Sequence, residues 1–198
     1  MFEIIIIICL ALIFGILLRR WPETKPVLSE EKVIEPELSD IDFLSEGEGH
    51  FENKNYQEAE KYYLKAATKD PDNALIYGRL GVIYFQQKNF KDAQAAFKTA
   101  IRLNPENGFY QNNLGLILFN LKRYKEALLY FENAVDLDEK DATRWVNLGL
   151  CYDKLGKTEK ALQSFKKAVE LEPKNKKYII LLEEAKEKRE NEMSKLSR

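Results

Sequence analysis

Few side chains in this sequence could carry out catalysis or bind a metal. His50 is the only histidine, and no candidate nucleophile stands near it at a spacing that a general base would need. Cys9 lies in an apolar run and Cys151 in a helical segment, so the two form neither a metal-ligand pair nor a disulfide framework. A glycine-rich phosphate loop is also absent from the sequence. The sequence therefore predicts a protein that is not an enzyme and that uses no cofactor or metal.

Two asparagines could instead hold the backbone of another polypeptide. Each side-chain amide of Asn113 and Asn147 offers both a donor and an acceptor. The alternative is that both are solvated residues on a helix surface. The choice depends on the elements that carry them.

Composition excludes one class of partner. Lysine and arginine number 31 against 32 for aspartate and glutamate, which gives a net charge of -1, so the chain has no overall attraction for nucleic acid. Hydrophobic residues make up 45% of the sequence, which is enough to bury a core. We therefore expect a folded protein that does not bind nucleic acid.

An internal repeat of about 34 residues organises most of the chain, and Asn113 and Asn147 occupy one position of it in successive units. Four columns of residues keep this spacing, and a fifth column has proline in three of its four positions, with Glu139 as the exception. The columns are Gly47, Gly81, Gly115 and Gly149; Ala59, Ala93, Ala127 and Ala161; Tyr63, Phe97, Phe131 and Phe165; Ala66, Ala100, Ala134 and Ala168; and Pro71, Pro105 and Pro173.

The spacing within each unit is that of two packed helices. Ala93, Phe97 and Ala100 recur at intervals of one helical face. Small residues in the glycine and first alanine columns let two helix backbones approach closely, and the aromatic residue fills the space beside them. Lys88-Asn89 and Lys122-Arg123 stand where the helices must turn. The repeat therefore predicts a series of helical hairpins.

The pattern resembles that of the tetratricopeptide repeat family. The fourth unit matches it in nearly every position, with Trp145, Leu148-Gly149, Tyr152, Ala161, Phe165, Ala168 and Pro173. The first unit departs most, because Glu46 and His50 replace the expected leucine and tyrosine, as in a terminal repeat that faces solvent. The resemblance implies an all-α, right-handed solenoid of four hairpins over residues 40–73, 74–107, 108–141 and 142–175. Residues 176–198 then form a capping helix with a charged tail.

In this family the first helices of successive units line a concave groove that takes a peptide or helix from a partner protein. The resemblance places these groove positions at Leu75, Arg79, Val82, Phe85, Gln86, Phe109, Asn112, Asn113, Leu116, Phe119, Thr143, Asn147, Leu150 and Lys154. Phe85, Leu116 and Phe119 could instead pack against the next helix as part of the core. The lysine, asparagine and arginine set with which some members hold chaperone carboxyl termini is absent, so a chaperone-tail receptor is not expected.

The N-terminus differs in character from the repeats. Residues 2–18 form an apolar run followed by Arg19, Arg20 and Trp21, which predicts a transmembrane anchor over residues 1–21. The arginines favour a cytoplasmic location for the repeats, at a bacterial inner membrane, with the N-terminus outside. A cleavable signal peptide is the alternative, although no small-x-small cleavage site follows the run.

Residues 22–39 contain three prolines and several glutamates, which predicts an extended acidic linker. Val33, Ile34 and Leu38 could make part of it a docking segment, including one that occupies the groove of the same chain.

These features together predict a membrane-anchored scaffold or adaptor that binds a protein partner in the groove. The sequence predicts neither the identity of that partner nor an oligomeric state. The main alternative is a receptor that hands precursor or envelope proteins to a membrane machine. An exported repeat protein and a regulatory subunit of an enzyme are the remaining possibilities.

Overall fold

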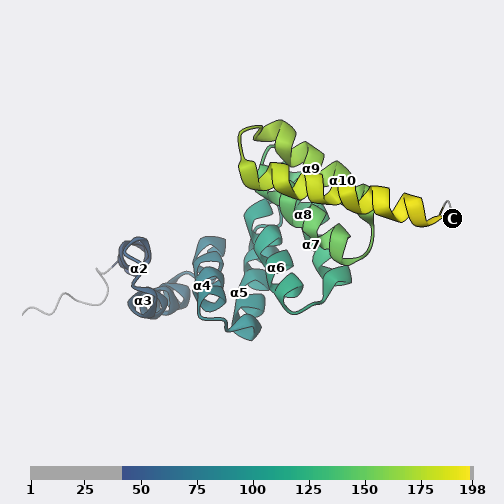
Figure 1. Ribbon diagram of the computed structural model, residues 1–198. Helices are drawn as coiled ribbons and strands as arrows, with labels where there is room; N and C mark the ends of the chain where they lie inside the picture. The colour runs from purple at the N-terminus through teal and green to yellow at the C-terminus, as the bar shows by residue number, and fades with distance from the viewer. Residues whose placement is uncertain (1–41, 197–198) are drawn as a thin grey trace, which may run out of the picture. The chain divides into compact units, whose positions relative to one another are not determined.

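The computed structural model describes residues 42–196, which form nine α-helices and, within that range, no β-strand (Figure 1). The helices are α2 (Phe43–Glu52), α3 (Tyr56–Lys69), α4 (Ala74–Gln86), α5 (Phe90–Leu103), α6 (Gly108–Asn120), α7 (Tyr124–Leu137), α8 (Ala142–Lys154), α9 (Thr158–Leu171) and α10 (Lys176–Leu196).

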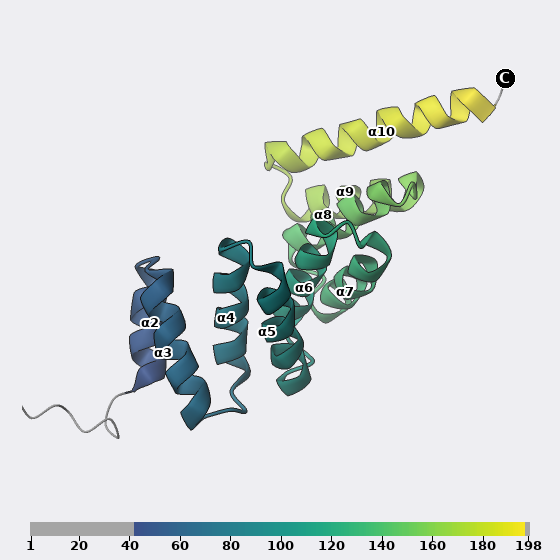
Figure 2. The same ribbon diagram turned by 90° about the horizontal axis from the view of Figure 1, so that it is seen from below.

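The helices pair into four hairpins, α2–α3, α4–α5, α6–α7 and α8–α9, and each hairpin packs against the next (Figure 2). Their second helices begin at Tyr56, Phe90, Tyr124 and Thr158, at a constant spacing of one repeat. The last helix, α10, packs against α9 at the end of the series (Figure 2). The all-α solenoid of helical hairpins expected from the repeat is therefore confirmed.

The glycine column allows the two helices of each hairpin to touch. A β-carbon added to Gly81 would lie 2.7 Å from the ring of Phe97, closer than real β-carbon contacts. The corresponding distances are 2.7 Å between Gly115 and Phe131 and 2.6 Å between Gly149 and Phe165. The aromatic ring therefore packs directly on the glycine backbone of the facing helix.

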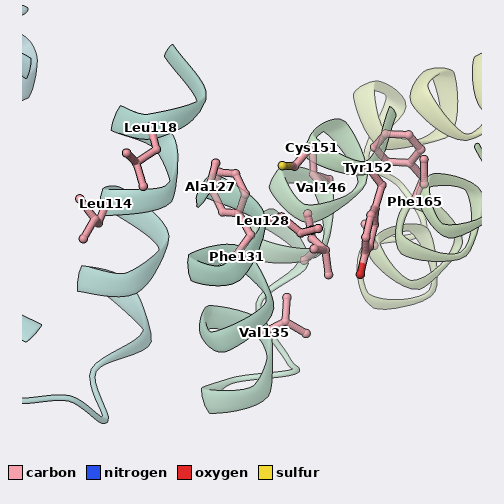
Figure 3. Close-up of a cluster of buried hydrophobic side chains, with 14 of the residues drawn as sticks. Leu114, Leu118, Ala127, Leu128, Phe131, Val135, Val146, Cys151, Tyr152 and Phe165 are labelled. Atoms are coloured by element: carbon pink, nitrogen blue, oxygen red, sulfur yellow. The ribbon is translucent and has the colours of Figure 1, made fainter. Parts of the chain in front are cut away.

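The alanine columns complete the core between the helices. Ala93, Ala100, Ala127 and Ala134 are fully buried, as is Phe97. Figure 3 shows the core of the later units, with Leu114 and Leu118 on α6, Phe131 on the neighbouring α7, and Val146 of α8 beside Leu128. One cluster of buried apolar residues extends from Ala93 of α5 to Ala185 of α10.

Turns and helix starts also follow the repeat. Asn73, Asn107 and Asp141 cap the starts of α4, α6 and α8 by accepting a hydrogen bond from a backbone N–H two residues later. Inside the hairpins, Lys54, Lys88 and Lys122 have positive φ angles, and Gly156 takes that position in the fourth unit. The polar residues expected at the turns therefore lie at the turns.

The first unit is polar on part of its surface, as expected from Glu46 and His50. Glu46 is exposed, whereas His50 is half-buried and stacks on the ring of Tyr62, with the ring centroids 5.2 Å apart. The Tyr62 ring therefore covers part of the imidazole ring of His50, which is not a free surface histidine.

The predicted transmembrane anchor and acidic linker lie outside the described residues. Among the helices within residues 42–196, none is both long and apolar enough to cross a lipid bilayer.

Substituting Gly81 with alanine should destabilise the fold by about 1–3 kcal/mol, because the new methyl group would collide with the Phe97 ring. Gly49 is the matched control, since it is an exposed position of α2 with no atom within 4 Å of an added β-carbon. Gly49→Ala should stabilise the protein by about 0.5–1 kcal/mol through higher helix propensity. Urea unfolding of the two variants gives both values, and equal effects would contradict the packing described for Gly81.

Stability should fall as the pH rises above about 9. Burial raises the pKa of the Cys151 thiol to about 11, whereas an exposed thiol ionises at about pH 8.5. Between these values the unfolded chain binds fewer protons than the folded chain, so the free energy of unfolding falls by up to about 1.4 kcal/mol per pH unit. Urea unfolding between about pH 8 and pH 10 should show a shallower decline in Cys151→Ala. Identical slopes would mean that the thiol is not protected in the folded state.

Candidate functional site

The first helices of the last three hairpins, α4, α6 and α8, lie next to one another. Side chains of α10 contact α8, so α10 continues the row. The side chains of Asn112 and Asn147 join α6 to α8 by a hydrogen bond of 2.8 Å. Thr143 of α8 lies 3.4 Å from the hydroxyl of Tyr178 in α10, within hydrogen-bonding distance. We call the surface that these four helices present the first-helix face.

All of the residues expected to line a groove are at least partly accessible. Leu75, Gln86, Phe109, Thr143 and Lys154 are exposed. The others are half-buried, and they are Arg79, Val82, Phe85, Asn112, Asn113, Leu116, Phe119, Asn147 and Leu150. These residues belong to α4, α6 and α8, which are neighbours in the row.

The asparagines have specific partners, which leave part of each amide unused. Asn113 donates from its side-chain nitrogen to the backbone oxygen of Phe109, one turn earlier in α6, over 2.8 Å. Asn147 donates to the side-chain oxygen of Asn112. Within residues 42–196, the side-chain oxygens of Asn113 and Asn147 have no hydrogen-bond partner, and neither does the side-chain nitrogen of Asn112. These three side chains therefore offer two unused acceptors and one unused donor.

Arg79 is already engaged by the protein. Its guanidinium donates two hydrogen bonds of 2.8 Å to the carboxylate of Glu48 and lies 4.7 Å from the centre of the Phe51 ring. Glu48 also accepts a hydrogen bond from the hydroxyl of Tyr63. The bonds to Glu48 raise the pKa of Arg79. Arg79 thus joins the first two units, and its side chain is only partly available to a ligand.

Phe85 and Phe119 contribute to packing as well as to the face. Phe85 contacts Phe90 of the same hairpin, with ring centroids 5.9 Å apart. Phe119 contacts Tyr124 edge to face at 5.1 Å and Phe131 at 6.4 Å. Both phenylalanines remain half-buried. Part of each ring therefore packs inside its hairpin, and part remains accessible.

These contacts belong to a sixth column that the sequence analysis missed. Phe51 stands one repeat before Phe85 and makes the same kind of contact with Tyr56, at 5.7 Å. The spacing of the repeat was sufficient to find this column. In the fourth unit its position is taken by Asp153.

Leu75 and Phe109 are the most exposed apolar residues of the expected set, with 40% and 45% of their surface accessible. They occupy the same position in successive units. Large apolar residues are also exposed on the second helices, for example Leu129 at 60%. Exposed apolar residues alone therefore do not distinguish the first-helix face from the second helices. The combination of exposed apolar residues with unused amide groups distinguishes it.

The structure assembles neither a reactive cysteine nor a metal site within residues 42–196. Cys151 is buried, its raised pKa keeps the thiol protonated at neutral pH, and its Sγ lies 3.2 Å from the backbone oxygen of Tyr124. No three histidine, cysteine or acidic side chains within residues 42–196 are placed so as to hold a metal ion together.

Comparison with known proteins gives the family. A family model described as tetratricopeptide repeat matches residues 44–93 and 79–142, and a second model with the same description matches residues 142–175. A search of curated proteins found no match.

Several solved structures have a similar fold. YrrB, described as a TPR protein with an unusual peptide-binding site, is 27% identical, with a TM-score of 0.68 over 75% of this chain and 77% of its own. MamA 41-end from Desulfovibrio magneticus RS-1 is 23% identical, with a TM-score of 0.71 over 77% of this chain and 86% of its own. The latter likeness concerns the fold alone. With its repeating hairpins and the match of the family model to half of its length, the chain belongs to the tetratricopeptide repeat family.

Proposed function

We propose that this protein is a membrane-anchored scaffold that binds a peptide or helix of a partner protein on its first-helix face. The observation that carries the proposal is the pairing of accessible apolar side chains at Leu75 and Phe109 with the unused amide groups of Asn112, Asn113 and Asn147. Apolar side chains provide the free energy of burial, whereas amides bind the backbone of a ligand and orient it.

The arrangement of the helices suits an elongated ligand. The first helices of successive units repeat the same positions, so a ligand that crosses them meets similar surfaces at regular intervals. YrrB, which has the same fold, is described as having a peptide-binding site. This description supports a peptide ligand for the present chain.

The apolar run of residues 2–18 supports the membrane anchor in this proposal. A tether would confine the first-helix face to the membrane surface and would raise its effective concentration for partners located there. Arg19 and Arg20 after the run favour a cytoplasmic face of a bacterial inner membrane. The scaffold would thus recruit or organise an assembly at that surface, and any chemistry would belong to the partner.

A receptor for precursor or envelope proteins is the second candidate. It shares the anchor and the binding face but predicts transient contacts with many unrelated apolar segments. The scaffold predicts a dominant partner instead. An exported repeat protein would lack the apolar run after cleavage.

A photoreactive residue in place of Phe109 should crosslink to the partner in native membranes, because this side chain is exposed on the first-helix face. The same group in place of Leu129, which is exposed on α7, should give little crosslinking. Mass spectrometry of the products identifies the partner. One dominant product indicates a scaffold, and many unrelated products indicate the receptor.

The same crosslinking experiment tests the face by mutation. The double variant Leu75→Ser/Asn147→Ala is compared with the parent protein, and both carry the photoreactive residue at position 109. Removing one apolar contact and one amide should reduce the crosslinked product about tenfold, which corresponds to a loss of about 1.4 kcal/mol in binding. Leu129→Ser is the control and should leave the product unchanged. Undiminished product in the double variant would disprove binding at this face.

The anchor makes a separate prediction. Full-length protein should remain in the membrane pellet after alkaline carbonate washing, whereas a chain lacking residues 1–21 should be released. Release of the full-length chain would disprove the membrane anchor but would not bear on binding at the first-helix face. A mature N-terminus near residue 22 would favour the exported protein.

A further inference from the structure

The fourth unit breaks the phenylalanine column at a position that faces α10. Phe51, Phe85 and Phe119 end the first helices of the first three units, and Asp153 stands at the corresponding place in α8. In the third unit the Phe119 ring covers the edge of Phe131, with the ring centroids 6.4 Å apart. The shorter Asp153 side chain cannot cover Phe165 in this way.

A pocket of about 260 Å³ is lined by both Asp153 and Phe165. Its apolar lining comes from three helices: Leu150 belongs to α8, Phe165 to α9, and Leu181 and Ala185 to α10. Leu150 is one of the residues expected to line the groove, so the pocket lies at the end of the first-helix face.

The rim of the pocket carries two carboxylates and one ammonium group. Asp153 and Lys188 form an ion pair, with 2.7 Å between Oδ1 and Nζ. Glu184 lies one turn before Lys188 in α10, is exposed, and has no hydrogen-bond or ion-pair partner within residues 42–196. Lys154, the next residue after Asp153, is not part of the lining. The rim therefore has one negative charge in excess.

From this geometry we infer that the pocket binds an arginine or lysine side chain of the partner segment. This inference rests on the proposed function, because it identifies one residue of the ligand that the first-helix face would hold. The methylene groups of a basic side chain lie against the apolar lining, and its charged end reaches Glu184 and the exposed part of Asp153.

The charges of the rim distinguish a basic residue from the obvious competitor, an aromatic one. A phenylalanine ring would match the apolar space that Phe119 occupies in the third unit, but it would form no ion pair with Glu184. A basic side chain fills the same apolar space and neutralises the excess charge.

The test uses the full-length chain in detergent micelles with labelled leucine and alanine methyl groups. The probes are the N-acetyl methylamides of arginine, lysine and phenylalanine, followed by NMR titration. The two basic probes should shift the methyl signals of Leu150, Leu181 and Ala185 in a saturable way. The phenylalanine probe should bind about two- to fivefold more weakly, as expected for the loss of one exposed ion pair.

Two variants connect the shifts to the pocket. Glu184→Gln should weaken binding of the arginine probe by about two- to fivefold. Glu187→Gln, an exposed substitution on α10 outside the lining, is the matched control and should change nothing. Asp153→Phe restores the residue type found in the other three units and should abolish the shifts by filling the pocket.

Several outcomes would overturn the inference. These are absence of saturable shifts with the basic probes, equal or tighter binding of the phenylalanine probe, and unchanged binding in Glu184→Gln. The small probes require no partner, so the result is independent of crosslinking at position 109. Failure of the probes with persistent crosslinking overturns the pocket inference alone. Saturable shifts without crosslinking at position 109 overturn the proposed function, and with it the assignment of the basic side chain to a partner segment.

Discussion

The contact between a glycine backbone and an aromatic ring, repeated in every hairpin, is the constraint on which the structure depends. At Gly81, Gly115 and Gly149 there is no room for even one methyl group between the two helices. The helices of each hairpin therefore approach to the same closeness, and the second helices begin at a constant interval of one repeat. Because neighbouring hairpins are so alike, they pack on one another in the same way, and the first helices come to lie in one row.

The row determines which residues can meet across the units. The side-chain pairs Asn112 with Asn147, Thr143 with Tyr178, and Asp153 with Lys188 each join residues 35 positions apart. A residue of one first helix thus contacts the first helix of the following unit at a position one residue beyond its own repeat equivalent. α10 makes two of these three contacts, so it continues the row as a first helix would, although no second helix follows it within the described residues. This continuation forms the closed end of the first-helix face.

The hairpins could be predicted from the sequence because small residues, aromatic residues and turns recur at one spacing. The partners of individual polar residues could not. Arg79 was expected to face a ligand, yet it binds Glu48 in the preceding unit, and nothing in the local pattern pairs these two residues. The bond between Asn112 and Asn147 likewise depends on how closely two first helices approach. The column of Phe51, Phe85 and Phe119 was visible at the repeat spacing, but α10 was needed to show what its interruption creates.

The interruption affects two adjoining columns at once. The first three units pair an aromatic residue at the end of the first helix with another at the start of the second, as in Phe119 with Tyr124. The fourth unit has Asp153 and Thr158 at these positions, and both bind α10: Asp153 accepts from Lys188, and Thr158 donates to Glu192. An aromatic pair would give the Lys188 ammonium group of α10 no carboxylate here. The same change that attaches the last helix also places Asp153 at the rim of a pocket whose lining includes Phe165, so the interruption of the column coincides with the proposed ligand site.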